Sequence, residues 1–166
     1  PLRIPADFHD VFFEFQSRGV NQLIIDLRYN RGGRTTSSIK LASMITGQFS
    51  GEVFAQTKHN DKLSYYDEDY LFEATTVQLK MDRLYVISSA ETASASELLI
   101  NGLSPYIDVI VIGDDTTGKN VGSYSIYDWI DDEGSVVLAY DFLWIHDINF
   151  VCSNARIEHR VSHDTV

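Results

Sequence analysis

Ser94 and Lys119 are the residues whose types and positions are best suited to chemistry in this sequence. Ser94 lies between an apolar run and a helical pattern, where the N–H groups of a helix start stabilise an oxyanion. A neutral lysine beside the serine takes its proton and returns it to a leaving amine. For this, burial has to lower the lysine pKa from about 10.4 to about 7. The pair therefore predicts a Ser–Lys dyad whose activity rises with pH.

Both residues also have other interpretations. Ser94 and Glu97 form the pattern of a capping box, which begins many helices. Lys119 ends a Gly-x-x-x-x-Gly-Lys pattern that follows an apolar run, as in a phosphate-binding P-loop. A P-loop opens a helix, however, and the residues after Lys119 alternate like a strand, with Asn120 in place of the magnesium-binding Ser or Thr. A helix cap and a nucleotide site thus remain alternatives.

Strand-like apolar runs alternate with helical patterns along the chain, which predicts an α/β fold with a mainly parallel sheet flanked by helices. The short continuous apolar runs are typical of strands buried on both faces. We expect Thr35 or Thr36 to cap the second helix. The predicted strands are 23–27, 84–87, 109–112, 121–129 and 136–145, with a turn at 131–134, and the predicted helices are 5–18, 35–45 and 94–103.

Three loops leave the carboxyl ends of the first three predicted strands, at 29–33, 89–94 and 114–119. Sites gather at this edge of a parallel sheet, and a helix followed by a returning strand would bring Lys119 beside Ser94. The oxyanion donors would be the Ala95 N–H and a backbone N–H of Gly32 or Gly33, where the bare backbone can approach a substrate closely.

Length and charge limit the classes of function. A chain of 166 residues fits a single domain, residues 1–166. Its net charge of −11 argues against nucleic acid and anionic membranes as partners. No apolar run approaches the roughly 20 residues that span a bilayer. The start at Pro1, without a leader, reads as a mature or trimmed piece, and the single Cys152 excludes an internal disulfide.

Other candidate sites have weaker patterns, and we expect no metal and no cofactor. None of the histidines lies in a motif that would direct it toward Ser94, and His159 and His163 lack the H-E-x-x-H zinc pattern. The acidic run at 67–69 lacks the spacing of a calcium loop, so we expect it to lie in an exposed acidic loop, a flap over the cleft. The five histidines are His9, His59, His146, His159 and His163.

Three segments in order resemble the C-terminal processing peptidases, also called tail-specific proteases. They are LIIDLRYNRGG at 23–33, TASASE at 92–97 and IGDDTTGK at 112–119. The resemblance implies a Ser/Lys serine endopeptidase with a ClpP- or crotonase-like α/β core that acts on peptides or proteins. It implies Ser94 as nucleophile, Lys119 as general base, and Ala95 with Gly32 or Gly33 as the oxyanion hole.

The resemblance is closest to the branch found in Bacteroidetes envelope lipoproteins, which implies a periplasmic or extracytoplasmic location. Asp26 matches a position that we expect to anchor the loop. Ser123 stands where many members carry a glutamine that orients the lysine. We see no substrate-capturing PDZ domain in this chain, and residues 142–166 do not match the closing strands of the family. A partial catalytic domain is therefore expected, with a catalytically impaired peptide-binding scaffold of the same fold as the alternative.

Overall fold

The chain forms an α/β structure with added antiparallel strands, as the sequence predicts. The computed structural model describes residues 8–119, 121–122, 124–130, 136–143 and 149–151. Among its helices, none has the length and apolar character to cross a bilayer. The elements, in chain order, are α1 Phe8–Ser17, β1 Ile24–Asp26, α2 Thr35–Ile45, η1 Gly47–Phe49, β2 Val53–Lys58, η2 Ser64–Tyr66, β3 Glu68–Leu71, β4 Arg83–Ser88, α3 Ala95–Leu103, β5 Asp108–Gly113, β6 Tyr124–Ile130, β7 Val136–Leu143 and β8 Asn149–Val151.

A parallel sheet with the order β1-β4-β5 carries the loops of interest. Burial alternates along the central strand β4, where Leu84 and Val86 are fully buried and their neighbours are not. Successive side chains of a strand point to opposite faces, so one face of this sheet lies against the core. The predicted parallel arrangement is confirmed.

The prediction that all three strands are buried on both faces is wrong for β1 and β5. Ile24 of β1 is 64% exposed and Ile112 of β5 is 51% exposed. In register, both lie on the same face as the partly buried β4 residues Tyr85 and Ile87. The continuous apolar runs therefore reflect a sheet whose second face stays open in the described part of the chain.

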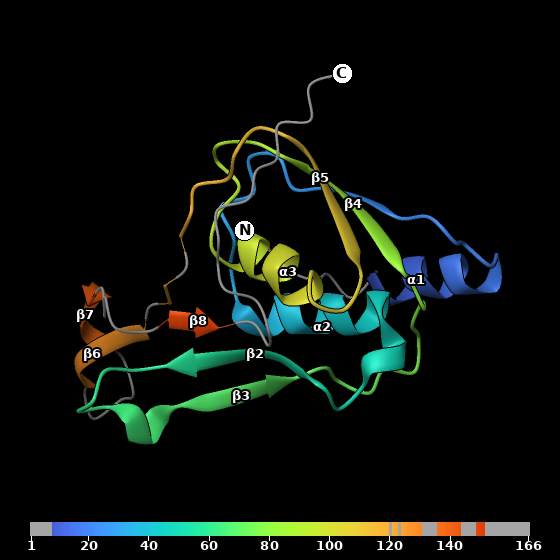
Figure 1. Cartoon of the computed structure of the whole chain (residues 1–166). Coiled ribbons are helices and arrows are strands. Elements are labelled where there is room, and N and C mark those ends of the chain that lie inside the picture. The colour runs from blue at the N-terminus through green and yellow to red at the C-terminus, as the bar shows by residue number, and fades with distance from the viewer. Residues whose placement is uncertain (1–7, 120, 123, 131–135, 144–148, 152–166) are drawn as a thin grey trace.

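Helices α2 and α3 lie between this sheet and an antiparallel sheet with the order β3-β2-β8 (Figure 1). Phe54 of β2 is fully buried, and its ring lies where a side chain on Gly102 of α3 would be. This close contact lets β2 pack directly on α3. The helices thus have a parallel sheet on one side and β2 on the other.

The hairpin of β2 and β3 was not predicted, and part of the expected acidic flap is a strand. Residues 68–71 pair antiparallel with β2 instead of forming a loop. These residues, Glu-Asp-Tyr-Leu, are mostly exposed, and their polar side chains do not give the apolar pattern that would predict a strand. The tertiary pairing overrides the weak local preference.

Two local predictions at other elements have different outcomes. Arg34, not Thr35 or Thr36, is the N-cap of α2, and it caps without a side-chain hydrogen bond. The expected C-terminal strands are present as the antiparallel pair β6–β7. The predicted turn at 131–134 lies outside the described residues.

Candidate functional site

The three loops that follow β1, β4 and β5 meet at one edge of the parallel sheet, as predicted. The Tyr29 N–H donates to Ser89 Oγ at 3.0 Å. The Ala93 N–H donates to the Asn30 carbonyl at 3.1 Å. Hydrogen bonds of this kind join loops that are far apart in the sequence, so each loop holds its neighbour in place.

Thr92 links all three loops from the centre. It is fully buried, and its hydroxyl donates to the Leu27 carbonyl at 2.8 Å while accepting the Ser89 N–H at 3.0 Å. Its own carbonyl accepts the Thr117 N–H at 2.9 Å. The threonine of the TASASE segment therefore has a structural task beside the candidate serine.

Ser94 adopts a strained backbone conformation at the turn from β4 into α3. It is the N-cap of α3, with φ 57° and ψ −118°. Only one other non-glycine residue of the described chain, Tyr29, has a positive φ. Such strain costs of order 1–3 kcal/mol and tends to occur at functional sites. A sharp strand-to-helix turn of this kind presents a serine side chain at the surface of the sheet edge.

The second serine of the segment, Ser96, has a different environment. It is fully buried, and its hydroxyl donates to the Asn30 carbonyl at 3.2 Å. Ser94, by contrast, is partly exposed. Because a nucleophile has to reach a substrate, accessibility favours Ser94 over Ser96.

Glu97 joins the Ser94 turn to the Lys119 loop. Its side chain is nearly buried, at 6% exposure of the residue. Oε2 accepts the Ser94 N–H at 2.7 Å and the Lys119 N–H at 2.9 Å. Oε1 accepts the Thr116 hydroxyl at 2.6 Å and the Gly118 N–H. One carboxylate therefore fixes the separation of the two candidate residues.

Sequence reasoning identified Glu97 only as part of a capping box. The capping bond to Ser94 is present, but the bonds to the loop at 116–119 come from residues far along the chain. The sequence signal that could have indicated the wider role of Glu97 is its position in a helix among mostly apolar neighbours, where a carboxylate becomes buried. Such a buried carboxylate needs several donors.

Lys119 is partly buried at the end of this loop, and no helix occurs among the described residues that follow it. The next described element is strand β6, which begins at Tyr124. Without a helix N-terminus, the phosphate site of a P-loop cannot form. The nucleotide hypothesis is therefore wrong. Asn120 and Ser123 lie outside the described residues.

Gly32 packs directly against the Ser94 turn. It has φ +95°, and a Cβ at this position would lie 2.8 Å from both the Ala95 nitrogen and Ser94 Cβ. Only glycine allows this approach without a clash. The Gly32 N–H donates to Asn30 Oδ1 at 3.1 Å. Gly33 follows in the chain and is exposed.

Two ion pairs lie at the surface of the loops. Asp26 accepts the Arg28 N–H at 3.0 Å and the Arg28 guanidinium, whose hydrogen bonds lower the pKa of the carboxyl. Arg31 pairs with Glu91 at 2.8 Å, which connects the first loop to the second. The anchoring role expected of Asp26 stays a prediction, although its carboxylate holds the start of the first loop.

The described histidines lie on other elements. His9 is an exposed residue of α1 beside Asp10. His59 lies in the loop after β2, beside Asp67, and its side chain is buried. Within the described ranges, no group of three or more candidate metal ligands occurs. His146, Cys152, His159 and His163 lie outside the described residues.

Comparison with known proteins decides the family. The family model described as Peptidase family S41 matches residues 3–148, which is most of the chain. The chain belongs to peptidase family S41. The predicted family of C-terminal processing and tail-specific proteases is thereby confirmed.

Two curated relatives of this S41 chain carry protease names. The tail-specific protease of Haemophilus influenzae is 27% identical over 153 residues, which cover 89% of this chain and 21% of the relative. The carboxyl-terminal-processing protease of Picosynechococcus is 29% identical over 138 residues, covering 82% of this chain and 31% of the relative. The chain thus spans less than a third of each curated relative.

Solved structures share the fold of this S41 chain. A structure of a candidate S41 protease from Bacteroides fragilis has a TM-score of 0.71 and 26% identity, covering 88% of this chain and 37% of that one. The photosystem II D1 C-terminal processing protease has a TM-score of 0.62 at 20% identity, covering 89% and 34%. The α/β core is therefore the fold of known S41 proteases.

Proposed function

We propose that this S41 chain is the core of a serine endopeptidase that hydrolyses peptide bonds through a Ser94–Lys119 dyad. The observation that carries the proposal is the shared acceptor: Glu97 Oε2 binds the backbone N–H groups of both residues, at 2.7 and 2.9 Å. The two residues come from different loops, and this shared acceptor holds their backbone N–H groups close together at the sheet edge. Both are partly exposed, so a substrate can reach them.

The chemical steps follow from this pair. The neutral Lys119 amine takes the proton of Ser94 Oγ as the oxygen attacks the scissile carbonyl carbon. The carbonyl electron pair moves to the oxygen, which becomes an oxyanion. When this intermediate collapses, the C–N bond breaks and the lysine ammonium gives its proton to the leaving amine. Water then attacks the acyl carbon and gives a proton to Lys119; the ester C–O bond breaks, the lysine ammonium returns the proton to Ser94 Oγ, and the acid is released.

The oxyanion would be held by the Ala95 N–H and an N–H of the glycine turn. Ala95 is the first residue of α3, where a helix N–H lacks an intrahelical acceptor. Gly33 is the better second donor, because the Gly32 N–H already donates to Asn30. Gly32 instead brings the turn against Ser94. Preorganised donors of this type supply about 3–4 kcal/mol each to the transition state.

We assign Glu97 as the positioning residue of the dyad. It is placed to act on the reaction through Ser94 and Lys119, since its carboxylate bonds to their backbones. A displacement of about 1 Å in such a pair costs roughly 100-fold in rate. The positive φ of Ser94 is a second constraint that this carboxylate helps to maintain.

The substrate would be a peptide or protein, as the names of the S41 relatives suggest. Cleavage near the carboxyl terminus and a location in the bacterial cell envelope belong to the same proposal. The supporting role of Ser123 also stays a prediction.

Hydrolysis of a quenched fluorescent peptide tests the proposal. We expect turnover by the wild type that rises with pH, and its loss in Ser94→Ala and in Lys119→Ala. Ser96→Ala is the matched control, since its hydroxyl is engaged with Asn30. Peptide binding by the wild type without turnover would instead support the non-catalytic scaffold. Equal activity in wild type and Ser94→Ala would exclude the dyad.

A further inference from the structure

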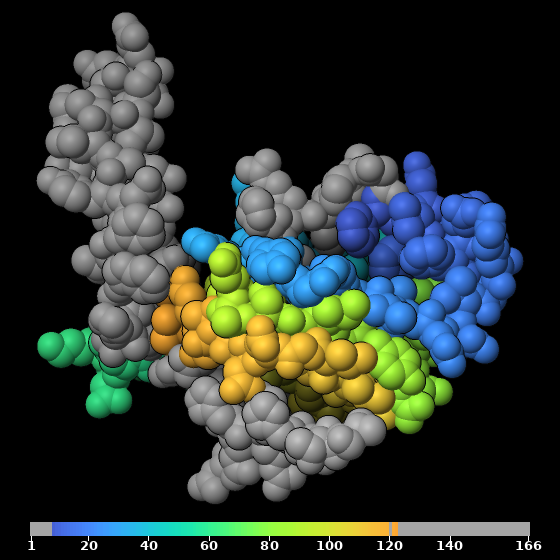
Figure 2. Space-filling model, turned by 90° about the horizontal axis from the view of Figure 1, so that it is seen from above, coloured from blue at the N-terminus to red at the C-terminus, as the bar shows by residue number. Residues whose placement is uncertain are grey.

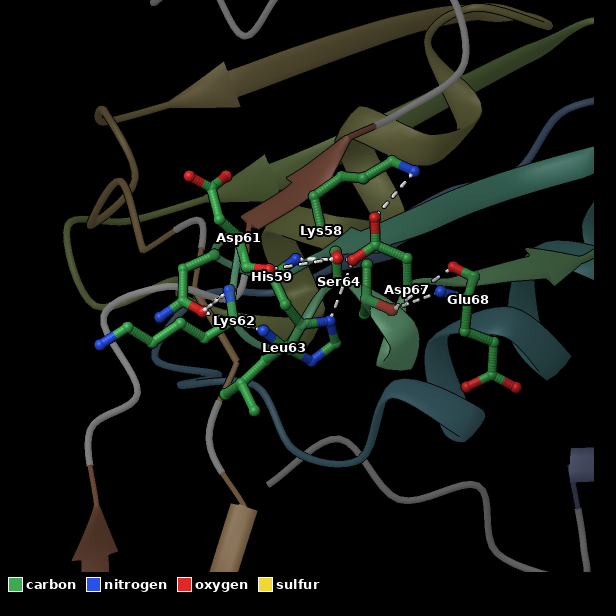
Figure 3. A network of polar contacts seen from close by, with 10 residues as sticks. Lys58, His59, Asp61, Lys62, Leu63, Ser64, Asp67 and Glu68 are labelled. Carbon is green, nitrogen blue, oxygen red and sulfur yellow. Dashed lines mark hydrogen bonds and ion pairs between the residues drawn. The ribbon is translucent and has the colours of Figure 1, made fainter.

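The turn between β2 and β3, residues 59–67, is tied by side-chain hydrogen bonds and carries two exposed tyrosines; we call it the hairpin tip. Asp67 accepts the His59 N–H at 2.8 Å, and its carboxylate also contacts His59 Nδ1 and Lys58 Nζ, both at 3.2 Å (Figure 3). The His59 side chain is 1% exposed. Asn60 Oδ1 accepts the N–H groups of residues 62 and 63, each at 3.1 Å. These bonds favour the folded conformation of the hairpin tip.

Tyr65 and Tyr66 lie in this hydrogen-bonded turn, in the short helix η2. Tyr65 is 71% exposed and Tyr66 is 58% exposed, and their ring centroids are 4.1 Å apart. Figure 2 shows part of the hairpin tip projecting beyond the body of the protein. Large aromatic surface that is held in water does not contribute to the core. Preorganised exposed tyrosines are instead typical of binding surfaces, because little entropy is lost on contact.

The charges around the tyrosines indicate the kind of partner. The side chains of Asp61 and Glu68 are exposed, and Figure 3 shows their carboxylates pointing away from the bonded network. The four acidic residues between 58 and 69 outnumber Lys58 and Lys62, in a chain of net charge −11. Aromatic faces and carboxylates together attract lysine and arginine side chains, through cation–π contacts and ion pairs. Anionic partners are repelled.

We propose that the hairpin tip is a docking surface for a lysine- or arginine-containing segment of a polypeptide. The strand β2 ends on the side of the molecule where α2 and α3 begin, which is the side of the Ser94 turn (Figure 1). If the proposed peptidase function holds, the docked polypeptide is its substrate, and the basic segment lies outside the scissile bond. The tip then selects substrates by charge, in addition to any selection at the dyad.

A binding measurement tests this without any turnover. A fluorescein-labelled Gly/Ser peptide with arginines at alternate positions is titrated with the Ser94→Ala chain, and anisotropy is recorded. We expect saturable binding that weakens with salt, and a loss of about tenfold or more in affinity in Tyr65→Ala/Tyr66→Ala. Tyr65→Phe/Tyr66→Phe keeps both rings and should bind like the parent. Glu68→Gln should weaken binding less than removal of the rings.

Several results would overturn the proposal. They are equal binding of a peptide with glutamates in place of the arginines, unchanged binding by the double alanine variant, and no saturable binding. Association with phosphatidylcholine vesicles in place of the peptide would assign the tyrosines to a membrane contact instead. Unchanged circular dichroism of the double variant is the folding control. Because Ser94→Ala is used, binding without hydrolysis by the wild type would refute only the peptidase, and hydrolysis without binding would refute only the docking surface.

Discussion

Ser94 and Lys119 are joined through a single oxygen atom: Oε2 of Glu97 accepts the backbone N–H of each, at 2.7 and 2.9 Å. The two nitrogens can therefore be no farther apart than the sum of these bonds. Glu97 Oε2 contacts main-chain groups of the two residues. The arrangement makes the geometry of the proposed dyad depend on one nearly buried carboxylate.

Replacement of Glu97 should separate effects on rate from effects on binding. In Glu97→Gln, an amide NH₂ replaces one of the two accepting carboxylate oxygens. The donors that bonded to that oxygen then face another donor and lose their acceptor. We expect kcat to fall about 10-fold or more, and about 100-fold in Glu97→Ala, with a smaller change in KM. Steady-state kinetics on a fluorogenic peptide measure this. The same alanine variant should lose roughly 2–4 kcal/mol of unfolding free energy, measured in urea.

Glu91→Gln is the matched control for that experiment. Glu91 lies in the same turn, but its carboxylate forms an exposed ion pair with Arg31. Exposed pairs contribute about 0–1 kcal/mol, so activity and stability should stay near those of the wild type. A Glu97→Gln enzyme with the kinetics of Glu91→Gln would remove Glu97 from the mechanism.

Gly32→Ala should disturb the Ser94 turn. The added methyl would lie 2.6 Å from the Ala93 carbonyl oxygen and 2.8 Å from Ser94 Cβ. The turn has to move, so we expect activity to fall about 100-fold, together with a loss of stability of a few kcal/mol. Gly51→Ala is the control, since Gly51 also has a positive φ but no atom within 4 Å of the added Cβ. It should show only the conformational cost of about 1–2 kcal/mol, and no loss of kcat. Equal effects at both glycines would contradict the role of close packing.

Ser94→Gly should exchange activity for stability. Ser94 has φ 57° and ψ −118°, a conformation that glycine adopts far more easily than other residues. We expect the glycine variant to be inactive and to unfold at a higher urea concentration than Ser94→Ala. Its free energy of unfolding should exceed that of Ser94→Ala by about 1 kcal/mol. Chemical denaturation of the three proteins checks this. A glycine variant less stable than the alanine variant would show that the backbone at Ser94 is not strained.

The hairpin tip should loosen in acid because of Asp67. The His59 backbone N–H, followed by the His59 ring and Lys58, lowers the pKa of the Asp67 carboxyl below its ordinary value of 3.8. Because its pKa is lower in the folded protein, the ionised Asp67 carboxylate stabilises the folded tip at pH values above 3.8. This stabilisation is lost as the pH falls through the lowered pKa. Carboxyl NMR titration gives the pKa, and hydrogen exchange at the His59 amide reports the loosening. Asp67→Asn should show no such dependence. An Asp67 that titrates at or above 3.8 would contradict the bond network.

Local patterns were sufficient for the elements that line the site. The strand runs at 23–27, 84–87 and 109–112 and the helices after the first two are present near the predicted residues, because apolar periodicity records which side chains face a core. Parallel strand order then requires the following loops to share an edge. Accessibility in the structure likewise favours Ser94 over Ser96, in line with the resemblance.

The β2–β3 hairpin could not be predicted from its own residues. The polar residues 68–71 form a strand because they pair with β2, and the ring of His59 is buried where it contacts Asp67. Both depend on a partner that a local pattern does not contain. The exposure of Ile24 and Ile112 has the same origin, since an apolar run does not say how many faces of a sheet are covered.

The amino-acid sequence by itself determined the family, the α/β class and the identity of the two candidate catalytic residues, because these depend on motifs that are local and ordered along the chain. Tertiary structure alone decided that Glu97 connects those residues and that Gly32 presses against their turn. A glutamate three residues after a helix-capping serine gives the same sequence pattern whether or not a distant loop binds its carboxylate. The hydrogen bonds of Glu97 to Thr116 and Gly118 form only because the packing of the sheet and helices brings the loop at 116–119 next to the start of α3.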